Sequence, residues 1–243
     1  MESFKLCVQS VDTYDGDAGP AYWTDGRRVF FLYREIDGAD IDSFIYYPGE
    51  WATDKKYCYN CSSRLDNADR KTFEVLNEMY AKDKFNVWAE GGKVKKADAG
   101  SFVVYNNDAY PPYGYCKDKN HVYFYFVQSK LNVVRNALPE TFNAINNDFG
   151  YDGKSVFWRS HKLKKADPKT WKILKNGYDY SKDKYIYFGN RIIKKADAET
   201  FEVIEGVKKF GRLVNYAKDK YNYYLQDKII TKDIFQKMAN LTV

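Results

Sequence analysis

Apolar residues recur along the chain in short runs, and each run follows an acidic turn signal. Seven aspartates give this signal, and the next residue is lysine in five copies and glycine in two. Both pairs favour a tight turn, because the acid bonds its own backbone and glycine accepts a positive φ. We call these residues the anchor aspartates; they are Asp25, Asp54, Asp83, Asp118, Asp152, Asp183 and Asp219. Their spacing of 29 to 36 residues predicts a repeat of seven units.

A strand that is apolar on both faces is predicted after each anchor. A small apolar residue lies three or four positions after the acid and an aromatic residue comes next, as in Val87–Trp88 and Ile186–Tyr187. In the last copy, Asn222–Tyr223 breaks the first position. Neighbouring residues of a strand face opposite sides, so this strand needs cover on both faces. We therefore expect the units to stack face to face.

A second marker, Ala-Asp, follows the next predicted strand. It occurs at Ala39–Asp40, Ala68–Asp69, Ala97–Asp98, Ala166–Asp167 and Ala196–Asp197. With Ser or Thr a few residues later, this marker aspartate is typical of an N-cap that opens one helical turn. A third short strand, such as Glu74–Leu76, is expected after the turn. Each unit therefore predicts three short strands and one capped turn.

These patterns predict an all-β fold and a single repeat domain over residues 1–243. We expect a repeat-built array of about seven short antiparallel β units with single capped helical turns, either open and solenoid-like or propeller-like. The last copy lacks its third strand, while Phe4–Val8 predicts a lone strand with no unit of its own. If the array closes into a ring, these two ends should complement one another.

The fourth copy, which begins at Asp118, departs most from the repeat. It has extra residues between anchor and marker, so its hairpin, roughly Val122 to Val134, should project beyond the others. Ahead of it lies the irregular segment Tyr105 to Tyr115, which contains Pro111–Pro112. Two consecutive prolines cannot sit in a central strand, so this segment is predicted to be a loop.

Composition agrees with β structure and adds little on function. Aromatic residues make up 18% of the chain, and they suit half-buried pleated surfaces. The net charge of +6 is a mild bias without the clustering typical of nucleic-acid binders. The N-terminal stretch lacks the features of a signal peptide, and no apolar run is long enough to span a membrane. If the chain begins at its natural start, we expect a cytoplasmic protein.

Candidate catalytic and metal-binding residues are few. His121 and His161 lie in predicted hairpins without an obvious nucleophile, so we interpret them as surface or structural residues. Cys58-x-x-Cys61 has zinc-like spacing, but no second pair follows, and Cys58 occupies a core position of the repeat. The recurring acids have turn and cap roles that explain them better than calcium does. We therefore predict no catalytic residue, no metal, no cofactor and no enzymatic activity.

Lysines recur before the marker, at Lys95–Lys96, Lys164–Lys165 and Lys194–Lys195. Stacked units would align them into a basic stripe, which could meet an acidic patch on a protein. The other interpretation is edge protection, because lysine on an exposed strand blocks edge-to-edge aggregation. The absence of arginine from the stripe argues against nucleic acid as the partner.

Aromatic residues outside the repeat positions are candidates for a protein interface, since exposed Tyr and Trp often anchor one. The alternative is that they pack against neighbouring units. The candidate partner-binding residues are Tyr105, Tyr110, Tyr113, Tyr115, Tyr22 and Trp23.

The stretches KDKYIYFGNRIIKKADAETFEVI and AKDKYNYYLQDKII resemble the DKNYY family of bacterial repeat proteins. The motif stands here as Asp118-Lys-Asn-His, Asp183-Lys-Tyr-Ile-Tyr and Asp219-Lys-Tyr-Asn-Tyr-Tyr, and the resemblance covers roughly Asp25 to Ile230. It implies no enzymatic role and no catalytic residues. Members of such families often occur beside polymorphic or type VI secretion toxins, as candidate immunity proteins.

The resemblance therefore implies a non-enzymatic protein that binds and neutralises a cognate secreted toxin. Its expected partner is that toxin, with no nucleic acid, membrane or small-molecule substrate. A carbohydrate- or envelope-binding module, with Tyr and Trp as sugar platforms, is the alternative. An enzyme would need acids or histidines that only the fold brings together.

Overall fold

The structure is a computed structural model that describes residues 4–5, 7–8, 21–90, 92–105, 113–126, 131–174, 179–209 and 212–239. The chain forms two compact units, Met1–Val133 and Val134–Val243, and we describe each by itself. The repeat runs through both units. The single domain over residues 1–243 stays a prediction.

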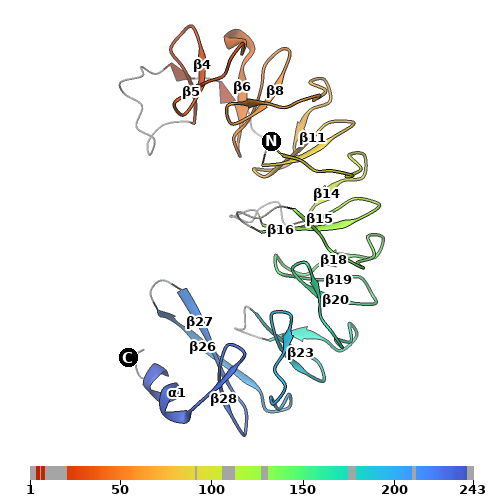
Figure 1. Cartoon of the computed structure of the whole chain (residues 1–243), viewed down its shortest axis with the longest axis vertical. Helices are drawn as coiled ribbons and strands as arrows, with labels where there is room; N and C mark the ends of the chain where they lie inside the picture. Colours follow the sequence, from red (N-terminus) through yellow and green to blue (C-terminus); the bar gives the residue numbers. More distant parts are fainter. Residues whose placement is uncertain are drawn as a thin grey trace. The chain divides into compact units, whose positions relative to one another are not determined.

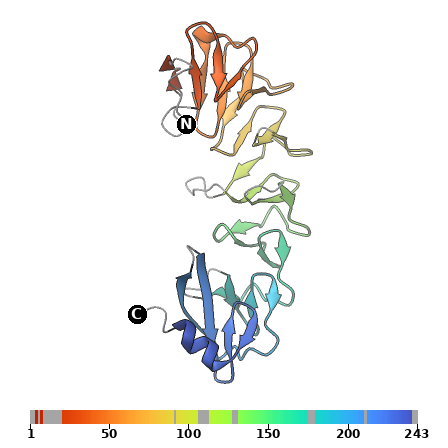
Figure 2. The ribbon, with the colours of Figure 1, turned by 60° about the vertical axis from the view of Figure 1, so that its left-hand side comes forward.

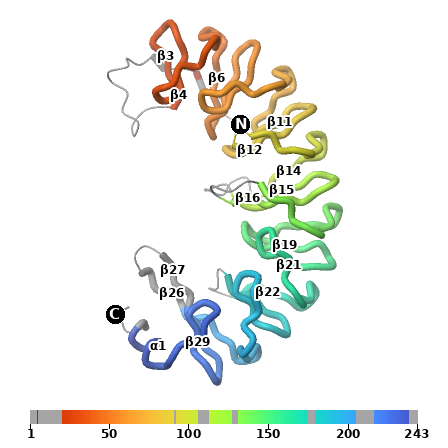
Figure 3. The backbone as a smooth tube through the Cα atoms, viewed as in Figure 1, coloured from red at the N-terminus to blue at the C-terminus, as the bar shows by residue number. Residues whose placement is uncertain are grey.

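In the first unit, the described residues form four small sheets, which follow one another in chain order (Figures 1 and 3). The first has the order β2(Cys7–Val8), β3(Tyr22–Thr24), β4(Val29–Phe31), β5(Arg34–Glu35). The second has the order β1(Phe4–Lys5), β6(Ile45–Tyr47), β7(Trp51–Thr53), β8(Cys58–Asn60), β9(Ser63–Arg64). The third has the order β10(Glu74–Val75), β11(Tyr80–Lys82), β12(Val87–Ala89), β13(Gly92–Lys93), and the fourth β14(Val103–Val104), β15(Gly114–Lys117), β16(Val122–Tyr125), β17(Asn132–Val133).

In the second unit, the described residues form three further sheets and a helix. The first two sheets have the orders β18(Asn143–Ala144), β19(Phe149–Tyr151), β20(Val156–Trp158), β21(His161–Lys162) and β22(Lys172–Ile173), β23(Tyr180–Lys182), β24(Ile186–Phe188), β25(Arg191–Ile192). The last has the order β26(Glu202–Lys209), β27(Arg212–Lys218), β28(Tyr223–Leu225), β29(Lys228–Ile230), and it precedes helix α1(Lys232–Ala239). The all-β array of about seven antiparallel units is thus confirmed.

Six of the seven sheets have four strands of the repeat, and the first has three together with β2, so the prediction of three strands per unit is wrong. The strand that was missed lies directly before the anchor, as β11 does before Asp83. It pairs with the third strand of the preceding copy, so that Glu74 faces Lys82 and Val75 faces Ala81. A strand of three residues is too short to show a clear alternation of polar and apolar positions in the sequence.

The N-terminal residues complete the first two sheets. β1 pairs with β6 in the antiparallel direction, and β2 pairs with β3 in the parallel direction. The last sheet is built from β26 to β29 alone among the described residues. The prediction that residues 4–8 complement the last copy is therefore wrong, because the first sheets offer them a free edge.

The capped turn is confirmed. Asp40 has extended backbone angles and accepts a hydrogen bond from the Ser43 nitrogen at 3.1 Å, which opens the short 3-10 helix Ile41–Ser43. Thr72, Ser101 and Thr200 donate the equivalent backbone bond to their own marker aspartates at 3.0 to 3.1 Å.

The core consists of layers between consecutive copies, as the two-faced strand predicts. One layer contains Tyr22, Val29, Ile36 and Phe44 from the first copy together with Ala52 and Tyr59 from the second. Another contains Tyr180, Ile186, Ile193 and Phe201 together with Ala217 and Tyr224 of the next copy. In each layer, one copy contributes the small apolar residue of its two-faced strand, and the next copy contributes the aromatic one.

A buried aromatic residue precedes every anchor by three positions, and our sequence analysis missed it. These residues are at most 4% exposed: Tyr22, Trp51, Tyr80, Tyr115, Phe149, Tyr180 and Tyr216. The next position holds a small residue in copies two to seven, because it backs onto the preceding copy. Gly150 illustrates the constraint, since a β-carbon there would lie 2.4 Å from the Phe142 ring. In the first copy this position holds Trp23, which stacks on Phe30 at 4.4 Å.

Helix α1 covers the last sheet of the second unit (Figure 2). Its Phe235 ring lies 4.7 Å from that of Tyr223 and 6.2 Å from that of Tyr216. In this copy the two-faced strand is Tyr223–Tyr224 rather than the expected Asn222–Tyr223, because Tyr224 is the ring that enters the inter-copy layer. The helix therefore takes the place of a next copy, as terminal caps do in repeat proteins. No helix among the described residues could span a membrane.

Candidate protein-binding site

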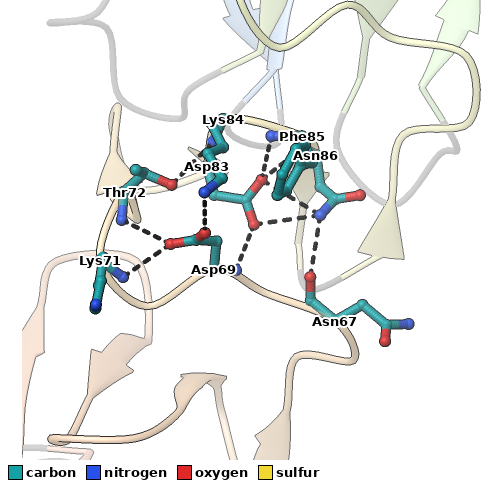
Figure 4. A network of polar contacts seen from close by, with 8 residues as sticks. All are labelled: Asn67, Asp69, Lys71, Thr72, Asp83, Lys84, Phe85 and Asn86. Atoms are coloured by element: carbon teal, nitrogen blue, oxygen red, sulfur yellow. Dashed lines mark hydrogen bonds and ion pairs between the residues drawn. The ribbon is translucent and has the colours of Figure 1, made fainter.

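The recurring Asp-Lys pair of the repeat connects neighbouring copies (Figure 4). Asp83 accepts hydrogen bonds from the backbone nitrogens of Phe85 at 2.7 Å and Asn86 at 2.6 Å, which form its own turn. Its other oxygen accepts the backbone N–H of Asp69, in the preceding copy, at 2.6 Å. Lys84 donates its backbone N–H to the hydroxyl of Thr72, and its ammonium lies 2.7 Å from Asp69. The Asp-Lys pair thus holds its own turn and also binds the preceding copy. We call this set of contacts between two copies the joint.

The same joint occurs between all seven copies. In each case the anchor carboxylate accepts the backbone N–H of the preceding marker at 2.6 to 3.0 Å. The pairs, donor first, are Asp40–Asp54, Asp69–Asp83, Asp98–Asp118, Leu138–Asp152, Asp167–Asp183 and Asp197–Asp219. The anchor acids are therefore committed to structure, which agrees with their interpretation as turn residues and adds the inter-copy contact.

A tyrosine hydroxyl completes the joint in three copies. Tyr59, Tyr123 and Tyr224 donate to their anchor carboxylates at 2.6 to 2.9 Å. Burial raises the pKa of Tyr59, and its hydrogen bond to Asp54 raises it further. Burial alone would raise the pKa of Asp54, but the hydroxyl of Tyr59 and three backbone N–H groups together lower it. Asp54 is therefore a fixed anion rather than a proton donor.

The cysteines and histidines show no catalytic arrangement in the described part of the chain. Cys58 is buried among Trp51, Leu65 and Trp88, so its interpretation as a core residue is confirmed. Burial raises the pKa of both Cys58 and Cys61 to about 12, so neither thiol is a ready thiolate. Within the described residues, no three His, Cys, Asp or Glu side chains lie together as a metal site would require.

Three of the predicted interface residues are core residues. Tyr22, Trp23 and Tyr115 are at most 2% exposed, so the prediction that they offer their rings to a partner is wrong. Tyr22 and Tyr115 occupy the buried aromatic position before the anchor, and the Tyr22 hydroxyl donates to the Glu50 and Cys61 carbonyls. Trp23 follows Tyr22 in β3, and its ring is buried against that of Phe30. The regular aromatic three residues before each anchor was the signal that would have identified Tyr22 and Tyr115.

The other predicted residues belong to the segment Tyr105 to Tyr115, ahead of the fourth-copy hairpin. Tyr105 and Tyr113 are half-buried and line one small pocket of about 10 Å³ together with Tyr115, which is room for a single water molecule. Tyr110 lies outside the described residues, as does the tip of the hairpin that was expected to project.

A further aromatic residue, Phe126, joins this site. Its ring packs edge-on against Tyr113 at 5.7 Å, and 40% of the side chain is exposed. Lys117 lies with its ammonium 5.8 Å from the Tyr105 ring. We call Tyr105, Tyr113 and Phe126 the aromatic cluster. Phe126 directly follows β16, the two-faced strand of the fourth copy, and only its exposure in the fold distinguishes it from the core aromatics.

Comparison with known proteins identifies the family of the chain but no individual relative. No curated protein and no solved structure matches the sequence. The family model described as DKNYY family matches residues 51–185, which is more than half of the chain and includes the anchors from Asp54 to Asp183. The joints built by these anchors are the structural role of the motif, and the chain belongs to the DKNYY family.

Proposed function

We propose that this chain is a non-enzymatic binding protein that neutralises a secreted bacterial toxin in the cytoplasm of the cell that makes it. The observation that carries the proposal is the aromatic cluster. Its residues lie at the copy that departs most from the repeat, while aromatic residues of the regular positions are buried between copies.

The cluster has the chemistry of an interface anchor. Tyrosine and phenylalanine present large, rigid surfaces at a low cost in conformational entropy, and buried aromatic residues dominate many protein interfaces. Tyr105 and Tyr113 are held by the sheet, because the Tyr105 nitrogen donates to the Tyr115 carbonyl at 3.0 Å and Tyr113 directly precedes β15. A partner would meet a surface that needs little ordering on binding.

The choice of a toxin as the partner rests on the association of such families with polymorphic and type VI secretion toxins. The product of the adjacent gene is the candidate. Co-expression should protect cells from that product, and the two proteins should co-purify as a complex. Absence of both protection and binding at micromolar concentration would contradict the proposal.

The aromatic cluster can be tested separately. Tyr113→Ala combined with Phe126→Ala should weaken toxin binding by about tenfold to a hundredfold, as loss of two anchors does. A matched control is Tyr33→Ala combined with Phe85→Ala, which removes two aromatic residues of the same unit that are 77% and 67% exposed. The control should retain affinity. Equal affinity of both double variants would place the contact elsewhere.

One observation favours a carbohydrate-binding module as the second candidate. A hydrophobic pocket of about 340 Å³ in the second unit is lined by Tyr151, Trp171 and two isoleucines. Aromatic faces of this kind suit the apolar faces of sugars. Calorimetric titration with N-acetylglucosamine oligomers would test it, with Tyr151→Ala as the variant that should abolish binding.

A further inference from the structure

A basic groove lies in the second unit, beside the edge strands of two consecutive sheets. β21 and β25 each stand last in the strand order of their sheet. The groove has a volume of about 730 Å³ and passes both strands. Five cationic side chains line it, and none of its lining residues is acidic: the cations are Arg135, Lys162, Lys164, Arg191 and Lys194.

Three of these cations come from one position of the repeat. Arg135, Lys164 and Lys194 each lie two residues before the alanine of the Ala-Asp or equivalent marker. The first two copies carry Asp37 and Asp66 at this position, so the charge is reversed along the chain. Because the copies stack, equivalent residues in consecutive copies line the same groove. The predicted alignment of Lys164 and Lys194 is confirmed, and the groove adds the arginines that the stripe was thought to lack.

The corresponding groove of the first unit is a natural comparison. It has a volume of about 510 Å³ and is lined by two cations, Arg64 and Lys93, and by two acids, Asp66 and Glu90. By repeat position, the two acids correspond to Lys164 and Gly189 in the second unit. The shape of the groove is thus a property of the repeat, whereas the excess of cations distinguishes the groove of the second unit from this one.

The cations of the basic groove are mostly uncommitted. Arg191 pairs with Asp227 at 2.9 Å, while Arg135, Lys162, Lys164 and Lys194 form no ion pair within the described residues. All four are exposed. The lysines that follow the anchors differ, since Lys55, Lys84, Lys119 and Lys220 each bridge to a marker aspartate. A group of unpaired cations in one concave surface favours an anionic occupant.

We propose that the basic groove binds an acidic, extended segment of a partner protein. Arginine forms bidentate hydrogen bonds with carboxylates, and two of the five cations, Arg135 and Arg191, are arginines. An extended segment presents every second side chain to one face, so alternate glutamates or aspartates would meet the cations of successive copies. This inference does not depend on the partner being a toxin.

A polypeptide fits the groove better than a nucleic acid. Single-stranded nucleic acids are usually held by aromatic rings that stack on bases, and no Phe, Tyr or Trp is among the groove's lining residues. The corresponding groove of the first unit has two acids beside its two cations, so it offers no continuous positive track for phosphates. An acidic peptide has no bases that need aromatic rings to stack on, and its carboxylates can pair with the five cations of this groove.

Fluorescence anisotropy tests the proposal with a labelled peptide of about ten residues that carries glutamate at every second position. The whole chain should bind this peptide, more weakly as salt is raised, and should not bind the same peptide with glutamine in place of glutamate. Lys162→Glu combined with Lys164→Glu should weaken binding about tenfold. Lys93→Glu combined with Lys95→Glu is the matched control, because these lysines occupy the same repeat positions in the third copy and change the net charge equally.

Each outcome decides the matter. Loss of affinity in the Lys162 and Lys164 variant alone would support the basic groove as the site. An equal loss in both variants would mean that net charge alone attracts the peptide, and the proposal would fail. It would also fail if the peptide did not bind, or if a single-stranded oligothymidylate of similar charge bound more tightly. Because the toxin is absent from this experiment, its result is separate from the test of the immunity function.

Discussion

The Asp83 carboxylate accepts the backbone N–H of Asp69 at 2.6 Å, and this hydrogen bond joins two consecutive copies of the repeat. Asp69 in turn caps its own helical turn and pairs with Lys84, the residue after Asp83. Two acids that look alike in the sequence therefore have different roles. Asp83 stabilises its own turn and accepts a hydrogen bond from the preceding copy. Asp69 caps a helical turn and binds the copy that follows it.

Replacing the anchor should be costly. Asp83→Ala leaves the backbone donors of Asp69, Phe85 and Asn86 without their acceptor, and Asp83 itself is only 3% exposed. We expect a loss of about 2–4 kcal/mol in the free energy of unfolding, measured by urea denaturation. Asp66→Ala, which removes an exposed acid, should change it by less than about 0.5 kcal/mol. Equal stabilities would show that the joint contributes nothing.

Stability should fall in acid. Hydrogen bonds from Lys119 and Ser101 lower the pKa of Asp98 from 3.8 to about 2. A carboxylate whose pKa is lowered by folding stabilises the protein above its unfolded pKa, and this contribution is lost as pH falls through the folded value. The melting temperature should therefore decrease between about pH 4 and pH 2. In Asp98→Asn this decrease should be smaller, and an unchanged slope would contradict the assignment.

Gly49 should tolerate no side chain. Its φ is +78°, and a β-carbon there would lie 1.9 Å from the carbonyl oxygen of Glu78, which also accepts the Trp51 indole N–H at 3.0 Å. Gly153 has the same φ of +78° but open space around it. Gly153→Ala should cost about 1–3 kcal/mol for its backbone conformation alone. Gly49→Ala should cost more in the same denaturation experiment, and equal losses would mean that the close contact relaxes freely.

The C-terminal helix should protect the last sheet. Phe235→Ala removes the ring that covers Tyr216 and Tyr223, at an expected cost of about 1–3 kcal/mol. Hydrogen exchange should accelerate in β28 and β29, next to the helix. Ile234→Ala is the control, because this neighbour in the same helix is 44% exposed. Similar exchange in both variants would argue against a capping role for Phe235.

Substitution of two nearby tyrosines should affect different properties, stability for Tyr115 and partner binding for Tyr113. Tyr115→Ala empties a position that is 1% exposed, and we expect a loss of about 3–5 kcal/mol in the free energy of unfolding. Tyr113→Ala, at the half-buried cluster, should cost much less and should affect partner binding instead. Thermal melting of the two variants separates these roles. If both were equally destabilising, Tyr113 would also belong to the core.

Local patterns in the sequence predicted much of the fold. The anchor spacing, the two-faced strand and the Asp-capped turn were all recognisable, because turn, cap and strand preferences act over a few neighbouring residues. The strand before the anchor was missed, since three residues carry too little alternation. Helix α1 was missed because it begins at the marker position of the last copy, Lys232–Asp233, where the repeat predicts a single capped turn, and it has only eight residues.

The sequence by itself determined that this is a β repeat of seven units, stacked through aromatic layers, with its exceptions in the fourth copy and at the ends. Only the tertiary structure decided that Tyr22, Trp23 and Tyr115 are buried, that Phe126 packs on Tyr113, and that the basic side chains of three copies line one groove. The physical reason is distance along the chain. These relationships join residues that become neighbours only when strands pair and copies stack.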